Sequence, residues 1–129
     1  MAQTVEVKRL YPDQTVTTGD GTAATDCTAG QMLVLAEDNS YSPQTDPTGD
    51  VDGMCFKDTL AGVLMPVVKA PAILYHAAVG GSPAYGDSLM VDAAAFPTKH
   101  DGNATKTDFG TVDQANADGS AEINFHNAG

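Results

Sequence analysis

The chain of 129 residues has no tryptophan, only two cysteines and only six basic residues, and each shortage excludes a class of protein. Two cysteines are too few for a disulfide scaffold. Six Lys and Arg against seventeen Asp and Glu give a formal net charge of −11, which argues against binding nucleic acid or an anionic membrane surface. No apolar run has the roughly 18 residues of a transmembrane helix. The first residues lack an apolar segment, so we expect no secretory signal.

Residues that favour turns and strands are abundant. Fourteen of the seventeen acids are Asp, and Gly, Pro, Asp, Asn and Ser together make up about a third of the chain. Valine outnumbers leucine by eleven to seven, which favours strands over helices. The apolar content of 42% argues against disorder. We therefore expect one all-β domain, a small β-barrel or sandwich with long polar loops.

Apolar segments of strand length recur about every ten residues, as in barrels and sandwiches. The pattern predicts strands at residues 31–36, 54–56, 87–92, 96–99, 109–113 and 120–126. The run at 72–79 is compatible with strand or helix. Gly62 and Pro66 would break a helix at 60–68, so a buried strand with Pro66 at an edge or bulge is predicted there. In the last strand, alternation places Ala121, Ile123 and Phe125 on one side.

Three polar stretches and the N-terminus complete this organisation. Residues 11–30, 37–53 and 100–108 are predicted to be exposed loops. Residues 4–10 alternate, with Val5 and Val7 on one side. We interpret residues 1–10 as a candidate extended N-terminal arm and residues 11–129 as a single β-rich domain. The alternative, that this strand pairs within its own barrel, stays open.

The acidic groups and glycines form no recognised site. Asp50 and Asp52 precede Gly53, but the following residues lack the further oxygen ligands of a calcium loop, so an Asp-rich turn is favoured. The glycine pairs have no phosphate-binding pattern. We expect no metal and no cofactor.

The thiols and imidazoles form no recognised site either. Cys27 and Cys55 lie 28 positions apart without a CxxC motif, which favours buried free thiols over a zinc site, while a disulfide stays open. His76 lies in an apolar run and is interpreted as a core or interface histidine. A small hydrolase with a Cys–His nucleophile is the least favoured hypothesis, because no local signature supports it. We therefore expect that the protein is not an enzyme.

The segment from residue 30 to residue 126 resembles the small capsid decoration (cement) proteins of tailed bacteriophages and related viruses. The resemblance rests on the pattern of strands and tight turns. Its pieces are the opening strand 30–34, Gly86 with Asp87, the strand 89–92, residues 109–112, the turn 115–119 and the final strand 121–125. The long polar stretch before residue 30 and the loop 37–53 depart from the shorter members.

The resemblance implies a structural role without catalysis. Such a protein binds the outer surface of an assembled shell, often as a trimer, and resists the pressure of packaged DNA. The expected partner is the major capsid protein, and the expected location is the outer capsid surface of the virion. Alternation in the N-terminal arm suits strand addition to a shell protein. The candidate shell contacts are Thr4, Val5, Val7, Lys8, Arg9, Leu10 and Tyr11.

A second hypothesis is a carbohydrate- or receptor-binding β-sandwich on a virion or cell surface. Such a site would present aromatic side chains in a groove. Tyr11, Tyr41, Tyr75 and Tyr85 are the available tyrosines, and the lack of tryptophan weakens sugar stacking.

Overall fold

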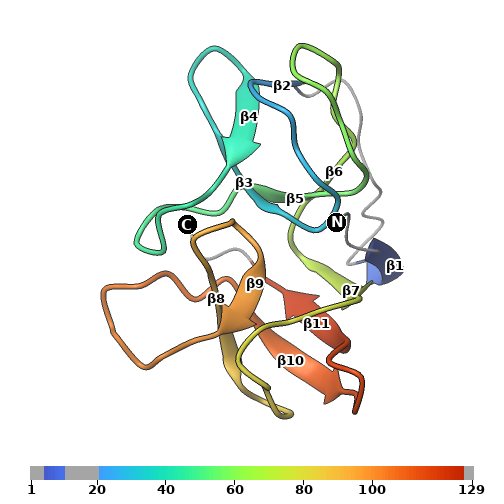
Figure 1. The fold of residues 1–129 in the computed structure, drawn as a ribbon, viewed down its shortest axis with the longest axis vertical. Coiled ribbons are helices and arrows are strands. Elements are labelled where there is room, and N and C mark those ends of the chain that lie inside the picture. Colours follow the sequence, from blue (N-terminus) through green and yellow to red (C-terminus); the bar gives the residue numbers. More distant parts are fainter. Residues whose placement is uncertain (1–4, 11–20, 127–129) are drawn as a thin grey trace.

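The fold, taken from a computed structural model, is built from short strands (Figure 1). The structure describes residues 5–10 and 21–126, and within them every regular element is a strand. The strands are β1 (Val5–Leu10), β2 (Thr22–Ala23), β3 (Met32–Leu35), β4 (Ser40–Pro43), β5 (Gly53–Cys55), β6 (Val67–Val68), β7 (Ala72–His76), β8 (Ser88–Val91), β9 (Pro97–Lys99), β10 (Gly110–Ala115) and β11 (Ala121–Phe125). In these residues the structure has no helix that is long and apolar enough to cross a membrane.

The strands form two curled sheets, which confirms the predicted all-β class. One sheet has six strands in the order β1-β7-β11-β10-β8-β9, and the other has five in the order β2-β4-β3-β5-β6. In Figure 1 the five-stranded sheet lies in the upper half and the six-stranded sheet mostly in the lower half. Neighbouring strands are antiparallel except β2 and β4.

In two strands of the six-stranded sheet, β11 and β7, the burial pattern follows the apolar pattern of the sequence. In β11 the alternation is confirmed, because Ala121, Ile123 and Phe125 are buried and the residues between them are half-buried. Strand β7 is central, with β1 on one side and β11 on the other. Four of its five residues are buried, which explains its continuous apolar run. The ambiguity at 72–79 is thus resolved as a strand that ends at His76.

The buried side chains form two clusters. The larger cluster contains residues of both sheets and holds them together: Met32, Val51, Met54, Val68, Ala72, Leu74, Val79, Leu89, Val91, Phe109, Val112, Ala121, Ile123 and Phe125. The smaller cluster lies within the five-stranded part and its loops: Ala23, Cys27, Leu33, Tyr41, Cys55, Met65 and Val67. Strands β3 and β5 contribute to both clusters, so β5 and the first half of β3 are buried on both faces.

Two predicted loops contain structure that the sequence pattern did not indicate. The stretch 37–53 includes β4, in which Tyr41 is fully buried, and the part of 11–30 that the structure describes includes β2. A tight turn at Asn39, with a φ of 67°, folds β4 back onto β3. The sequence does not reveal β4 because Tyr41 is its one fully buried residue, and the flanking Ser and Pro residues give no apolar alternation.

The predicted buried strand at 60–68 is wrong for most of its length. Only Val67 and Val68 form a strand, and residues 60–64 form an exposed turn. Gly62 has a φ of 83°, a left-handed conformation that breaks an extended run. Pro66 precedes β6, and its carbonyl accepts a hydrogen bond from the backbone N–H of Phe56.

His76 joins the two sheets, which confirms its interpretation as a core histidine. The ring is fully buried at the end of β7, and its Nε2 lies 3.2 Å from the carbonyl oxygen of Gly30, just before β3. Its Nδ1 accepts a hydrogen bond of 3.3 Å from the backbone N–H of Ala78, so the proton belongs on Nε2. Phe96 packs edge-on against the ring. Burial lowers the pKa of His76, and the neutral form is the one this site accommodates.

We predict that His76 makes the folded protein less stable as the pH falls below about 6.5. The folded pKa is lowered, so the unfolded chain takes up the proton first and stability is complete only above the unfolded pKa. One such group changes the free energy of unfolding by at most about 1.4 kcal/mol per pH unit. The measurement is chemical unfolding between about pH 5 and 8, in an H100Q/H126Q variant whose only histidine is His76. A flat profile over this range would contradict the prediction.

Candidate functional site

The edge of the six-stranded sheet at β9 is covered by the chain that follows β7. Gly80 forms a parallel bridge with Thr98. The Gly80 N–H donates to the carbonyl of Pro97 at 3.1 Å, and the Lys99 N–H donates to the carbonyl of Gly80 at 2.9 Å. A Cβ at Gly80 would lie 2.7 Å from the Thr98 Oγ1, so glycine permits this close approach. Strand β9 therefore offers little free backbone to another chain.

The five-stranded sheet curls until its two ends meet. Thr22 in β2 forms an antiparallel bridge with Leu64, shortly before β6. The Ala23 N–H donates to the carbonyl of Val63 at 3.0 Å. Because β2 and β6 are the outer strands of this sheet, these bonds close the gap between its edges.

The remaining sheet edge is that of β1. This strand pairs with β7 on one side, and no described strand pairs with its other side. The register shifts between Val7 and Arg9, so Lys8 sits at a bulge. Residues 5–10 thus form part of the molecule's own sheet, and no strand of the described residues pairs with their outer edge. Of the candidate shell contacts, the structure brings Val5, Val7, Lys8, Arg9 and Leu10 together in β1, while Thr4 and Tyr11 lie outside the described residues.

A second surface feature, the apolar turn, comprises residues 60–64 in the connection between β5 and β6. Leu60, Val63 and Leu64 are 68%, 49% and 58% exposed, and they are three of the four large hydrophobic residues exposed within residues 21–126. Full burial of such a side chain is worth about 1.5–3 kcal/mol, and covering the part still exposed here would contribute about 1–2 kcal/mol. Sequence reasoning missed this surface because its apolar run reads as a core strand. Gly62 in the middle of that run was the available signal for a turn.

The Asp residues form a repeated local motif, the Asp turn, at residues 38–40, 46–48 and 118–120. In each, one carboxylate oxygen accepts hydrogen bonds from the backbone N–H and the hydroxyl of the Ser or Thr two residues later. These bonds lower the pKa of Asp38, Asp46 and Asp118. Asn103 makes the same two bonds to Thr105 without a charge. The abundance of Asp is thus partly explained by tight turns.

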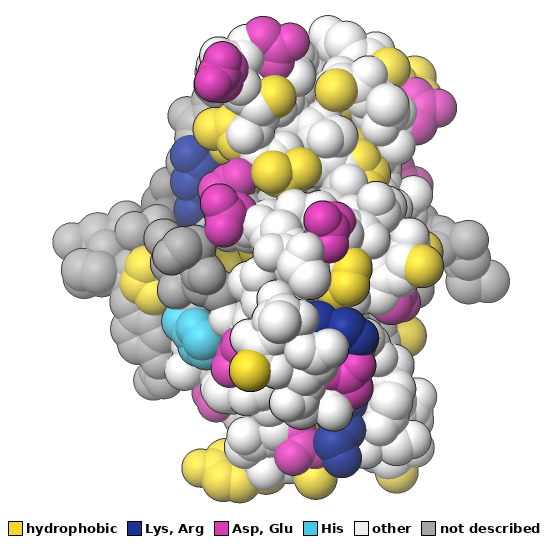
Figure 2. All heavy atoms as spheres, turned by 90° about the vertical axis from the view of Figure 1, so that its left-hand side faces the viewer, with side chains coloured by type: hydrophobic (Ala, Val, Ile, Leu, Met, Phe, Trp, Pro, Cys, Tyr) yellow, Lys and Arg dark blue, Asp and Glu magenta, His cyan; other side chains and the backbone are white. Residues whose placement is uncertain are grey.

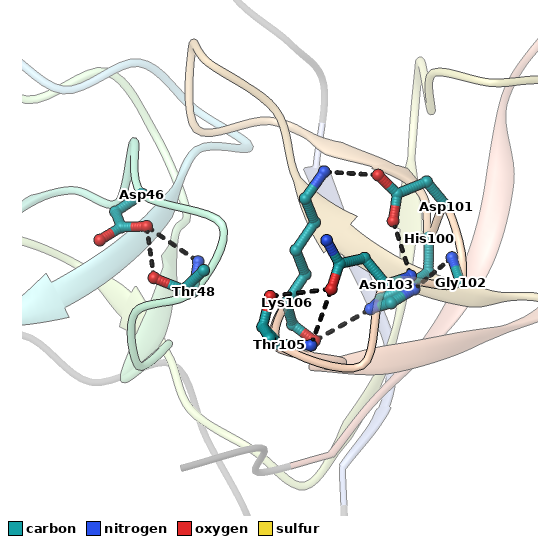
Figure 3. Close-up of polar contacts among 8 residues, drawn as sticks. All are labelled: Asp46, Thr48, His100, Asp101, Gly102, Asn103, Thr105 and Lys106. Carbon is teal, nitrogen blue, oxygen red and sulfur yellow. Dashed lines mark hydrogen bonds and ion pairs between the residues drawn. The ribbon is translucent and has the colours of Figure 1, made fainter.

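Two acidic loops lie side by side on the left of Figure 1: residues 44–52 between β4 and β5, and residues 100–109 between β9 and β10. Figure 3 shows side chains of both loops. The Thr107 N–H donates to the carbonyl of Pro47 at 2.7 Å and joins them. His100 bridges its loop, with its Nδ1 accepting from the Gly102 N–H and its Nε2 3.0 Å from the carbonyl of Lys106. Lys106 is also paired with Asp101, as Figure 3 shows. The polar groups in this region stabilise its own turns, and the described residues contain no cluster suited to a metal ion.

The two sides of the molecule in Figure 1 differ in character. β1 and the apolar turn lie on the right, with the turn in the upper right loop, and the acidic loops lie on the left. The left side, seen directly in Figure 2, carries acidic side chains along most of its length. In this view, β1 and the apolar turn therefore lie on the side opposite the two acidic loops.

The two cysteines considered as nucleophiles lie in the interior. Cys27 and Cys55 are free, buried thiols in the smaller core cluster. Their Sγ atoms donate to the carbonyls of Thr25 and Lys57. Burial is the main cause that raises the pKa of Cys27 to about 11 and that of Cys55 to about 12. Both thiols are therefore protonated near neutral pH, the unreactive form.

The tyrosines do not gather into a groove among the residues that the structure describes. Tyr41 is fully buried, Tyr75 is half-buried in β7 and Tyr85 is 80% exposed, while Tyr11 lies outside the described residues. A hollow of about 170 Å³ lies between the turn at Ser82 and the β10–β11 turn, and Tyr85 is not among its lining residues.

We predict that the Asp turns need an acceptor oxygen more than a charge. Asp118→Asn keeps the acceptor and should stay close to wild type at pH 7, whereas Asp118→Ala should unfold at a lower temperature. The folded pKa of Asp118 is lowered, so its contribution is complete above the ordinary value of 3.8 and is lost as the pH falls through the folded pKa. Asp118→Asn should therefore lose less stability in acid. Thermal unfolding by circular dichroism from pH 3 to pH 7 measures this, and equal melting temperatures for the two variants would contradict it.

We also predict that the folded protein reacts slowly with a thiol reagent. With a pKa of about 11, about one Cys27 in a thousand is ionised at pH 8, and fewer Cys55 are. Ellman's reagent should detect two thiols at once in denaturant and react with the native protein at least about a hundredfold more slowly. A native rate equal to that of a free thiol peptide would show that the thiols are accessible. Fewer than two thiols in denaturant without reductant would show oxidation.

Comparison with known proteins places the chain in no family. No protein-family model and no curated protein matches its sequence. The open edge of β1, the apolar turn and the acidic turns are the features from which we infer a function.

Proposed function

We propose that this protein is a capsid decoration protein, which binds the outer surface of an assembled shell and stabilises it without catalysis. Its partner in this proposal is the major capsid protein, and its location is the outer surface of the virion. The resemblance of residues 30–126 to small cement proteins suggests the role. The observation that supports it most directly is the outer edge of β1, with which no described strand pairs.

The proposed contact is strand addition at β1. A strand of the shell protein would pair with the backbone N–H and C=O groups on the outer side of residues 5–10. In this arrangement the N-terminal segment stays in its own sheet and receives a strand, so it need not act as a free arm. Lys8 and Arg9 are two of the six basic residues of the chain, which would favour an acidic partner at this edge.

The stabilisation follows from mass action. A protein that binds only the assembled lattice favours assembly by RT ln(1 + [L]/Kd), about 2.7 kcal/mol per site at a free concentration of 100 Kd. A trimer, the oligomer we propose on the shell, would contact several shell subunits at once. Its weak individual contacts would then combine through a high effective concentration.

The acidic face fits the outward side of such an arrangement. With β1 against the shell, the acidic loops on the left of Figure 1 would face solvent. A net charge of −11 per copy keeps a densely covered particle dispersed through mutual repulsion.

We predict saturable binding to empty, expanded tailed-phage shells from the same source, measured by co-sedimentation. Bound protein should raise the temperature at which the shells disrupt. Removal of residues 1–10 should abolish binding, and K8E/R9E should weaken it about tenfold in low salt and less in high salt, where exposed charges are screened.

The matched control is K99E/K106E, which reverses one charge in β9, at the opposite edge of the same sheet, and one in the loop between β9 and β10. It should bind like the wild type, and the melting temperature of each variant shows whether its fold is intact. If the folded wild-type protein binds no shell, the proposal fails, and a glycan array then tests the carbohydrate-binding hypothesis. Sedimentation of the protein eluted from shells tests the trimer.

A further inference from the structure

We infer that the apolar turn, residues 60–64, is a second contact with the shell. It would insert into an apolar pocket of the shell protein whose rim carries Lys or Arg side chains. This inference rests on the proposed function and adds a surface that strand addition at β1 does not use.

The exposure of the turn has no explanation within the described fold. Leu60, Val63 and Leu64 concentrate their apolar surface on one turn, although 24 apolar residues within residues 21–126 are buried. The fourth large exposed hydrophobic residue, Tyr85, lies elsewhere, in the connection between β7 and β8. A compact group of exposed aliphatic side chains is typical of an interaction site.

The turn is also held in one conformation. The Gly62 N–H donates to the carbonyl of Ala23 at 2.7 Å, and the Ala61 N–H donates to the Asp26 carboxylate at 2.9 Å. The bridge between Thr22 and Leu64 fixes its end to β2. A turn ordered before binding loses little conformational entropy when it docks, so more of its apolar burial appears as affinity.

The charges beside the turn indicate which kind of protein surface would bind it. The carboxylate of Asp26 accepts a hydrogen bond from the Ala61 N–H of the turn. Asp58 lies just before the turn, and its carboxylate accepts a hydrogen bond from the Ala29 N–H. Both acids are exposed, against one exposed base, Lys57. A second copy of this chain, at a net charge of −11, would bring the same acids to the contact. A different protein with a basic rim complements this surface better than a second copy does.

The position of the turn suits simultaneous contact with β1. Both lie on the right side of Figure 1, opposite the acidic loops. A shell surface that adds a strand to β1 would therefore face the same side of the molecule as the apolar turn.

The test is co-sedimentation of L60S/L64S with the same shells. Binding should weaken at least about tenfold relative to the wild type, with an unchanged melting temperature. The single variant L60S, at the most exposed position of the turn, should show a smaller loss and serves if the double variant unfolds. Tyr85→Ser is the matched control, since it removes exposed apolar surface outside the turn and should bind normally.

The attraction between this turn and a basic rim on the shell protein is tested separately with D26N/D58N. In this variant each Asn keeps an acceptor oxygen for the backbone N–H that the Asp bound. This variant should bind about twofold to fivefold more weakly at low salt, and the difference should shrink as salt is added. An effect that does not depend on salt would overturn the charge complementarity.

The remaining outcomes separate the two proposals. If the wild type binds shells and L60S/L64S binds equally well, the apolar turn is not a contact and strand addition at β1 stands. If the wild type binds no shell, both proposals fail. If L60S/L64S changes the oligomeric state of the free protein in sedimentation, the occupant is a second copy, and the inference is overturned.

Discussion

Backbone hydrogen bonding at strand edges is the constraint on which the rest of the structure depends. A strand at the edge of a sheet leaves unpaired N–H and C=O groups that another chain can pair with. Here the strands are two to six residues long, and two curled sheets bring most of the edges to backbone partners. The glycine at position 80 and the bridge at Leu64 have their structural role in this closure. β1 is left as the strand with an outer side free of described strands.

The closure of the five-stranded sheet also explains the apolar turn. The chain that covers β2 must turn sharply before it enters β6, and this turn carries the exposed leucines. The closure and the apolar turn are therefore parts of one connection. A change that loosened the bond between Gly62 and Ala23 would disturb both.

Strands could be predicted from the sequence where apolar side chains alternate or form a run. They could not be predicted where few of their side chains are apolar. The alternation in residues 121–125 predicted the final strand, and the apolar runs predicted β3 and β8 within one residue at each end. The run at 72–79 was compatible with strand or helix, and the structure shows the strand β7. β4 was missed because Ser40 and Ser42 carry no apolar signal, and the residues 60–64 were misjudged because an apolar run can be exposed as well as buried. Of the proposed site, the residues of β1 could be named from the sequence. Its open edge could not, since that depends on which strands pair far apart in the chain.

The neutral turn at Asn103 shows that the geometry of the Asp turns does not need a negative charge. Fold and surface charge are therefore separable at these positions. Exchange of Asp38, Asp46 and Asp118 for Asn would remove three negative charges and change the net charge from −11 to −8, with every acceptor oxygen kept. Repulsion between crowded copies can thus vary along a lineage without a change of fold. At these turns the surface charge can therefore change by up to three units while the fold is kept.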